Sequence, residues 1–68
     1  MQVDYDYLKR WLSAREIREI REGNNKSGIK LSRQQTLNIM KGKSKNFPFL
    51  NELIEVAKHN EVMSTINT

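Results

Sequence analysis

The side chains best suited to recognise a nucleic acid stand together between Ser32 and Asn46. They comprise one guanidinium and three amides, then three lysines and a serine: Arg33, Gln34, Gln35, Asn38, Lys41, Lys43, Lys45 and Ser44. Arginine pairs with guanine O6 and N7, and glutamine or asparagine pairs with adenine N6 and N7. Ammonium and hydroxyl groups bind phosphate oxygens, which positions a protein without reading sequence. The segment therefore has the chemistry needed both to read bases and to hold a phosphate backbone.

The charge of the chain is concentrated around the same segment. The formal net charge is +4, but residues from Gly23 through Asn51 carry +6 with no Asp or Glu, while the remainder carries −2. This segregation predicts one electropositive face of the kind that binds phosphate. Lys26 and Lys30 belong to this stretch and are further phosphate-binding candidates. The alternative is a solvated basic loop that binds nothing.

Catalytic chemistry finds little support in the sequence. There is no cysteine, and the single histidine, His59, is placed where it would complement a helix dipole rather than act as a base. The acidic pairs Asp4/Asp6 and Glu52/Glu55 lack partners at the spacing of an acid–base or metal site, and no glycine-rich phosphate loop occurs. We therefore expect no enzymatic activity, metal, cofactor or small-molecule ligand.

Length and hydropathy predict one small domain. At 68 residues, 37% of them hydrophobic, the chain must rely on well-packed helices, a partner subunit or a bound ligand for stability. No apolar run approaches the roughly 18 residues of a membrane span, and there is no charged-then-apolar leader. These features predict a cytoplasmic protein that does not associate with membranes.

Two helices are predicted before the basic stretch. An apolar stripe over residues 7–12 indicates a helix that starts near Asp4, and its spacing favours packing of Tyr5, Tyr7 and Trp11 in the core over stacking on bases. Ser13 to Glu16 forms a capping box that starts the second helix. In this helix Ala14, Ile17 and Ile20 are expected to face inward, with Arg15/Glu19 and Arg18/Glu22 at ion-pair spacing outside and Gly23 at its end.

The basic stretch itself is predicted to be a loop followed by a third helix. Residues 23–31 have loop composition, with Ile29 and Leu31 as apolar anchors. Ser32 caps the helix and Gly42 ends it. The inward positions are Thr36, Ile39 and Met40, and the side chains roughly opposite them are Gln34, Asn38 and Lys41.

A fourth helix follows, capped by Asn46 or Phe47, with Pro48 in its first turn. Its buried stripe is expected to comprise Phe49, Leu50, Leu53, Ile54 and Ala57. The pattern weakens after Asn60. We therefore predict a single domain over residues 1–60 and a frayed tail over residues 61–68.

The run from Ser32 to Thr36, with Ile39-Met40 and the turn Gly42 to Asn46 followed by Pro48, resembles a known pattern. It is similar to small helix-turn-helix DNA-binding domains of the phage-repressor (Cro/repressor, Xre-like) kind, over Ser13 to about Lys58. The resemblance implies an all-α compact bundle of four to five short helices. The chain departs from the family in three places: residues 23–31 make the turn about twice the usual four residues, Phe47 is additional, and Leu37 replaces a small polar residue.

The resemblance also implies residue roles. Arg33, Gln34 and Asn38 would read bases in the major groove, with Gln35 as an adjunct. The residues that would hold the phosphate backbone are Ser32, Lys41, Lys43, Ser44 and Lys45, with Lys26 and Lys30 added from the charge pattern.

We therefore expect sequence-specific binding of double-stranded DNA, by a transcriptional regulator or a mobile-element accessory factor. Repressors of this kind usually bind as dimers, and Val62, Met63 and Ile66 form the one candidate dimer element. The alternative is that the chain is the DNA-binding part of a longer regulator. The main alternative is a protein-interaction module, antitoxin-like or a phage-encoded inhibitor, that binds an acidic protein surface. RNA binding is disfavoured because exposed aromatic residues and RNA-module motifs are missing.

Overall fold

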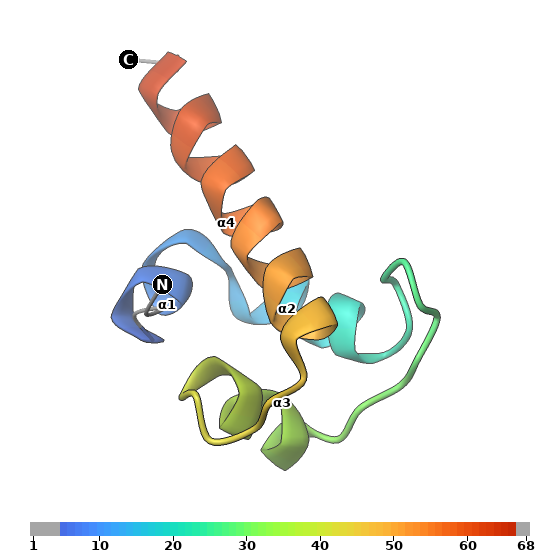
Figure 1. Ribbon diagram of the computed structural model, residues 1–68. Coiled ribbons are helices and arrows are strands. Elements are labelled where there is room, and N and C mark those ends of the chain that lie inside the picture. The colour runs from blue at the N-terminus through green and yellow to red at the C-terminus, as the bar shows by residue number, and fades with distance from the viewer. Residues whose placement is uncertain (1–4, 67–68) are drawn as a thin grey trace.

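The computed structural model describes residues 5–66, which form four helices and no strand. They are α1 (Tyr5–Trp11), α2 (Ala14–Arg21), α3 (Arg33–Met40) and α4 (Phe47–Ile66). α4 lies against the other three helices along most of its length, and its C-terminal end projects away from them (Figure 1). The predicted all-α bundle is confirmed, although α4, with 20 residues, is longer than the short helices expected.

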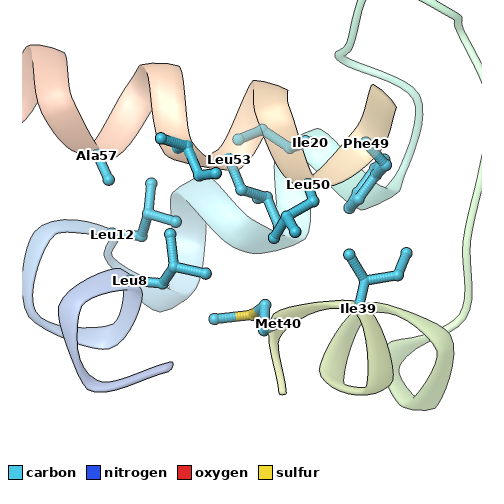
Figure 2. Close-up of a cluster of buried hydrophobic side chains, with 10 residues drawn as sticks. Leu8, Leu12, Ile20, Ile39, Met40, Phe49, Leu50, Leu53 and Ala57 are labelled. Carbon is cyan, nitrogen blue, oxygen red and sulfur yellow. The ribbon is translucent and has the colours of Figure 1, made fainter. Parts of the chain in front are cut away.

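The core lies where α4 meets the three shorter helices. Figure 2 shows side chains of α4 directed toward those of α1, α2 and α3. Leu8 of α1 and Leu53 of α4 are both 0% exposed, so they form its centre. The other buried apolar residues are Leu12, Ile20, Ile39, Met40, Phe49, Leu50, Ile54 and Ala57. The predicted stripe of α4 is therefore confirmed, and Tyr5, Tyr7 and Trp11 pack against this core as expected.

Two capping boxes fix the starts of α2 and α3. At α2 the Glu16 backbone N–H donates to Ser13 Oγ (3.1 Å), and the Ser13 N–H donates to Glu16 Oε1 (3.0 Å). At α3 the Gln35 N–H donates to Ser32 Oγ (3.1 Å), and the Ser32 N–H donates to Gln35 Oε1 (2.8 Å). Each pair satisfies two backbone groups that a helix start would leave without partners.

Glycines end the same two helices. Gly23 and Gly42 have φ angles of +117° and +78°, which side chains with a Cβ rarely adopt. After α3 the Lys43 N–H donates to the Asn38 carbonyl (2.8 Å) and the Gly42 N–H donates to the Ile39 carbonyl (3.1 Å), the pattern of a Schellman motif. The chain therefore turns sharply after α3 and enters α4.

Of the two predicted caps of α4, Asn46 and Phe47, the structure shows Asn46. Its Oδ1 accepts from the Phe49 N–H (3.3 Å), and Pro48 lies in the first turn, where no intrahelical N–H is needed. Phe47 is 59% exposed and does not contribute to the core.

α4 continues past Asn60, so the predicted frayed tail is wrong for residues 61–66, which are helical. Contacts to α1 and α2 stabilise this extension. Asn60 Nδ2 donates to the Trp11 carbonyl (2.7 Å) and to Glu16 Oε2 (3.0 Å), and the Tyr7 hydroxyl donates to Glu61 Oε1 (3.2 Å). Residues 67–68 of the predicted tail and the expected helix start near Asp4 lie outside the described residues.

These contacts also shift two ionisations. The hydrogen bonds from Asn60 and from Ser13 hold the pKa of Glu16 below its ordinary value of 4.5. Burial, followed by the hydrogen bond and negative charge of Glu61, raises the pKa of Tyr7 above 10.0. The Tyr7 shift thus follows from the contact between α1 and α4, whereas the Glu16 shift combines the contact with α4 and the local cap of α2.

Three smaller expectations are wrong. Ala14 is exposed, because it lines a groove beside Arg15 and Arg18 and is not part of the core. Ile29 is 54% exposed, whereas Leu31 packs against the core and is the true anchor of the loop. Among the described residues the Arg15–Glu19 ion pair forms (3.1 Å), but no Arg18–Glu22 pair does.

None of the described helices has the length and apolar character needed to cross a bilayer.

Candidate nucleic-acid interface

The outer face of α3 presents the predicted amides to solvent. Thr36, Ile39 and Met40 are 2–3% exposed and hold the helix to the core. Gln34 is exposed and Asn38 half-buried on the other side, and Gln34 Nε2 donates to Asn38 Oδ1 (3.1 Å). This hydrogen bond aligns the two amides and leaves the Gln34 carbonyl oxygen and the Asn38 amino group available to a ligand.

The other two candidates for base reading have different surroundings. Arg33 stands at the first position of α3, exposed, beside the arginines of α2, and within residues 5–66 it makes no side-chain hydrogen bond or ion pair. The Gln35 side chain is instead bound to the backbone of Ser32, in the capping box. Gln35 therefore serves to cap α3, as its position three residues after Ser32 also indicates.

Lysines surround the turn that leaves α3. Lys43 and Lys45 are exposed, and in the described part of the chain neither makes an ion pair. Lys41 Nζ lies 5.6 Å from the centre of the Tyr5 ring, a cation–π distance that fixes the lysine near α1 while retaining its charge. The half-buried Ser44 is held by its N–H, which donates to the Asn38 carbonyl (3.2 Å). The turn therefore carries three positive charges beside the exposed amides.

The long connection between α2 and α3 is organised by one side chain, Asn25. Its Nδ2 donates to the carbonyls of Ile20 (2.7 Å) and Ile29 (2.9 Å). Its Oδ1 accepts from the N–H groups of Ser27 (3.0 Å) and Ile29 (3.3 Å). These hydrogen bonds give the loop a defined shape, which sets where the chain enters α3.

Lys26 lies apart from the other predicted phosphate-binding residues. Its backbone N–H donates to Glu52 Oε1 (2.8 Å), and its Nζ is 3.2 Å from Glu55 Oε2, so the loop is attached to α4. Both ends of the ion pair are largely exposed, so it contributes little stability by itself. Lys26 is therefore engaged with α4, while Lys30 is exposed and makes no ion pair among the described residues.

The structure adds basic residues that the sequence reasoning missed. Arg15, Arg18 and Arg21 of α2 line a groove with Arg33 of α3 and Lys9 of α1. The groove has a volume of about 490 Å³. The signal was present in the sequence, because three arginines repeat at i, i+3 and i+6 on one side of a helix. The ion-pair spacing of Arg15 with Glu19 and of Arg18 with Glu22 masks this signal in the sequence.

No cluster of side chains in residues 5–66 is suited to hold a metal ion. Comparisons with protein families, curated proteins and solved structures find no match to this chain. The functional argument therefore rests on the geometry of α3 and its surroundings.

Proposed function

We propose that the chain binds double-stranded DNA in a sequence-specific manner, with α3 in the major groove. The observation that carries this proposal is the outer face of α3, where a hydrogen bond aligns Gln34 with Asn38. The cations on either side of these amides, Arg33 before them and Lys43 and Lys45 after them, form no ion pair among the described residues. α3 has eight residues, and an α-helix with its side chains is about 10–12 Å in diameter, which fits the major groove, about 12 Å wide.

Each group on this face has a defined task in the proposed complex. Gln34 and Asn38 read adenine edges through their amides, and Arg33 reads guanine. Lys41, Lys43, Lys45 and Lys30 bind phosphates, and the hydroxyls of Ser32 and Ser44 add neutral contacts. Gln35 stays in the cap and contributes indirectly, because it fixes the N-terminal turn that carries Arg33. Lys26 is left out of this interface because it is attached to α4.

Such a protein would act as a transcriptional regulator or as an accessory factor of a mobile element. Binding as a dimer to two half-sites one helical turn apart would raise its affinity and specificity. The projecting end of α4 offers apolar contacts for a dimer, since Val62, Met63 and Ile66 are 53%, 43% and 69% exposed.

The salt dependence of DNA binding tests the proposal. Four lysine–phosphate contacts predict that log K falls with log salt concentration with a slope of about −3.6 per protomer. Fluorescence anisotropy with a labelled duplex of mixed sequence, titrated at several salt concentrations, measures this slope. Lys43→Ala should reduce its magnitude by about 1.

Lys58→Ala is the matched control, because Lys58 is an exposed lysine on α4 outside the proposed interface. It should leave the slope unchanged. Absent binding at low salt, or affinity that does not depend on salt, would reject DNA binding and favour the protein-interaction alternative. Preference for single-stranded RNA in competition with the duplex would favour the RNA alternative.

A further inference from the structure

The groove between α1, α2 and α3 combines a cationic rim with an apolar floor. Arg15, Arg18 and Arg21 of α2 form one edge, and Arg33 and Lys9 extend the positive charge to α3 and α1. No carboxylate of the described residues lines it, and its floor is formed by Ile17, Leu37 and Met40. We propose that this groove binds an acidic, amphipathic peptide segment of a partner protein.

The charges on the rim are available to such a partner. Arg18, Arg21 and Arg33 form no side-chain hydrogen bond or ion pair within the described chain, and Arg15 is paired only with the exposed Glu19. Guanidinium groups bind carboxylates through two parallel hydrogen bonds, which are among the stronger contacts a protein surface offers. The rim is therefore complementary to carboxylates.

The shape of the rim favours a peptide over a small anion. Arg15 and Arg21 are six residues apart on a helix, which separates their Cα atoms by about 9 Å along its axis. A row of cations this long can engage several carboxylates in succession, whereas a small monoanion uses only one or two of them. An extended or helical peptide with repeated Asp or Glu residues matches this spacing.

The floor of the groove favours a peptide over a nucleic acid. Ile17 and Leu37 are half-buried, so an occupant gains free energy by covering their remaining exposed surface with apolar side chains. A DNA backbone brings phosphates to the rim but no aliphatic chain to the floor. A peptide that alternates acidic and apolar residues satisfies both parts of the groove.

A peptide selection on the full chain tests this proposal without assuming a partner. A display library of random 12-residue peptides is selected on the immobilised protein, and the affinity of enriched peptides is measured by fluorescence polarisation. The enriched peptides should combine at least two Asp or Glu residues with Leu, Ile or Phe. Arg18→Gln should weaken them about tenfold, which corresponds to the loss of one charge-assisted contact.

Leu37→Gln should lower the affinity for the same peptides, because it removes part of the apolar floor. Lys58→Gln on α4 should leave the affinity unchanged. Circular dichroism verifies that each variant is folded. An oligoglutamate that binds as tightly as the selected peptides would overturn the proposal, because charge alone would then suffice. A selection without acidic peptides, or peptides insensitive to Arg18→Gln, would overturn it as well. If Arg18→Gln reduces only DNA affinity, the groove belongs to the DNA interface instead. The readout with peptides requires no DNA, so it succeeds or fails independently of the function proposed above.

Discussion

The Asn60 side chain connects three helices through a single amide. Its Nδ2 lies 2.7 Å from the Trp11 carbonyl at the end of α1 and 3.0 Å from Glu16 Oε2 in the first turn of α2. Glu16 uses its other oxygen for the Ser13 N–H, so one carboxylate serves both the cap of α2 and the contact with α4. A local cap and a tertiary contact are thereby coupled at one residue.

This coupling makes part of the stability dependent on pH. The pKa of Glu16 is lowered in the folded protein, so its carboxylate contributes stability above pH 4.5, and this contribution is lost as the pH falls through the lower, folded-state value. Glu16→Gln retains only one acceptor oxygen. We expect it to lower the free energy of unfolding at pH 7 by about 1 kcal/mol, and the difference from the unsubstituted protein to shrink below pH 4.5.

Urea denaturation followed by circular dichroism at pH 7 and pH 3 measures both differences. The same comparison in an Asn60→Ala background provides the control, because Asn60 is the first cause of the pKa shift. In that background, the effect of Glu16→Gln on the free energy of unfolding should depend less on pH. A difference that stays constant between the two pH values would contradict the assigned role of the Glu16 carboxylate.

At the scale of elements, the loop between α2 and α3 decides how the candidate reading helix is presented. The Asn25 side chain makes four hydrogen bonds within or beside this loop. The Leu31 N–H then donates to the Arg21 carbonyl (2.7 Å), which brings the end of the loop back to α2. The connection over residues 22–32 is in this way attached to α2 by hydrogen bonds at both of its ends.

We expect Asn25→Ala to loosen the loop and to reduce stability by about 1–3 kcal/mol, because several backbone groups lose their partners. In the proposed DNA-binding function it should also lower affinity, since α3 would be less firmly positioned. Thermal and urea denaturation measure the first effect and anisotropy the second. Asn24→Ala is the matched control, because the exposed Asn24 side chain makes no hydrogen bond among the described residues. Equal effects of the two substitutions would show that the Asn25 network does not organise the loop.

The elements that the sequence predicts well are those whose signals are local. Ser13 and Ser32 as caps, Gly42 as the end of α3 and the buried stripe of α4 follow from short-range chemistry and helical periodicity, and all are confirmed. The continuation of α4 is accompanied instead by a contact between Tyr7 and Glu61, which are 54 positions apart. A local pattern contains no information about such a contact.

At the scale of the whole molecule, folding redistributes the charges seen in the sequence. Lys26 belongs to the basic stretch, but its ammonium group forms an ion pair with Glu55 of α4. Conversely, the arginines of α2 come from a segment of mixed charge, yet they line the groove beside Arg33. Counting charges along the sequence therefore does not show which basic residues share a face, because only the packing of the helices decides that.

In the proposed function, different parts of the molecule read the DNA bases and hold the DNA backbone. Gln34 stands on the outer face of α3, and Lys43 stands in the turn that follows it. Loss of a base-reading amide should relax the preference at particular base pairs by roughly 1–3 kcal/mol, whereas loss of a phosphate contact should weaken binding to all sequences alike. These two substitutions therefore report on the orientation of α3 in the complex.

Selection of binding sites from random duplexes, performed with the unsubstituted protein, Gln34→Ala and Lys43→Ala, tests whether the outer face of α3 reads DNA. We expect the unsubstituted protein to enrich a defined sequence, Lys43→Ala to enrich the same sequence at lower affinity, and Gln34→Ala to lose preference at one or two base pairs. No enriched sequence, or indistinguishable profiles for the two variants, would contradict the proposal that α3 reads DNA through its outer face.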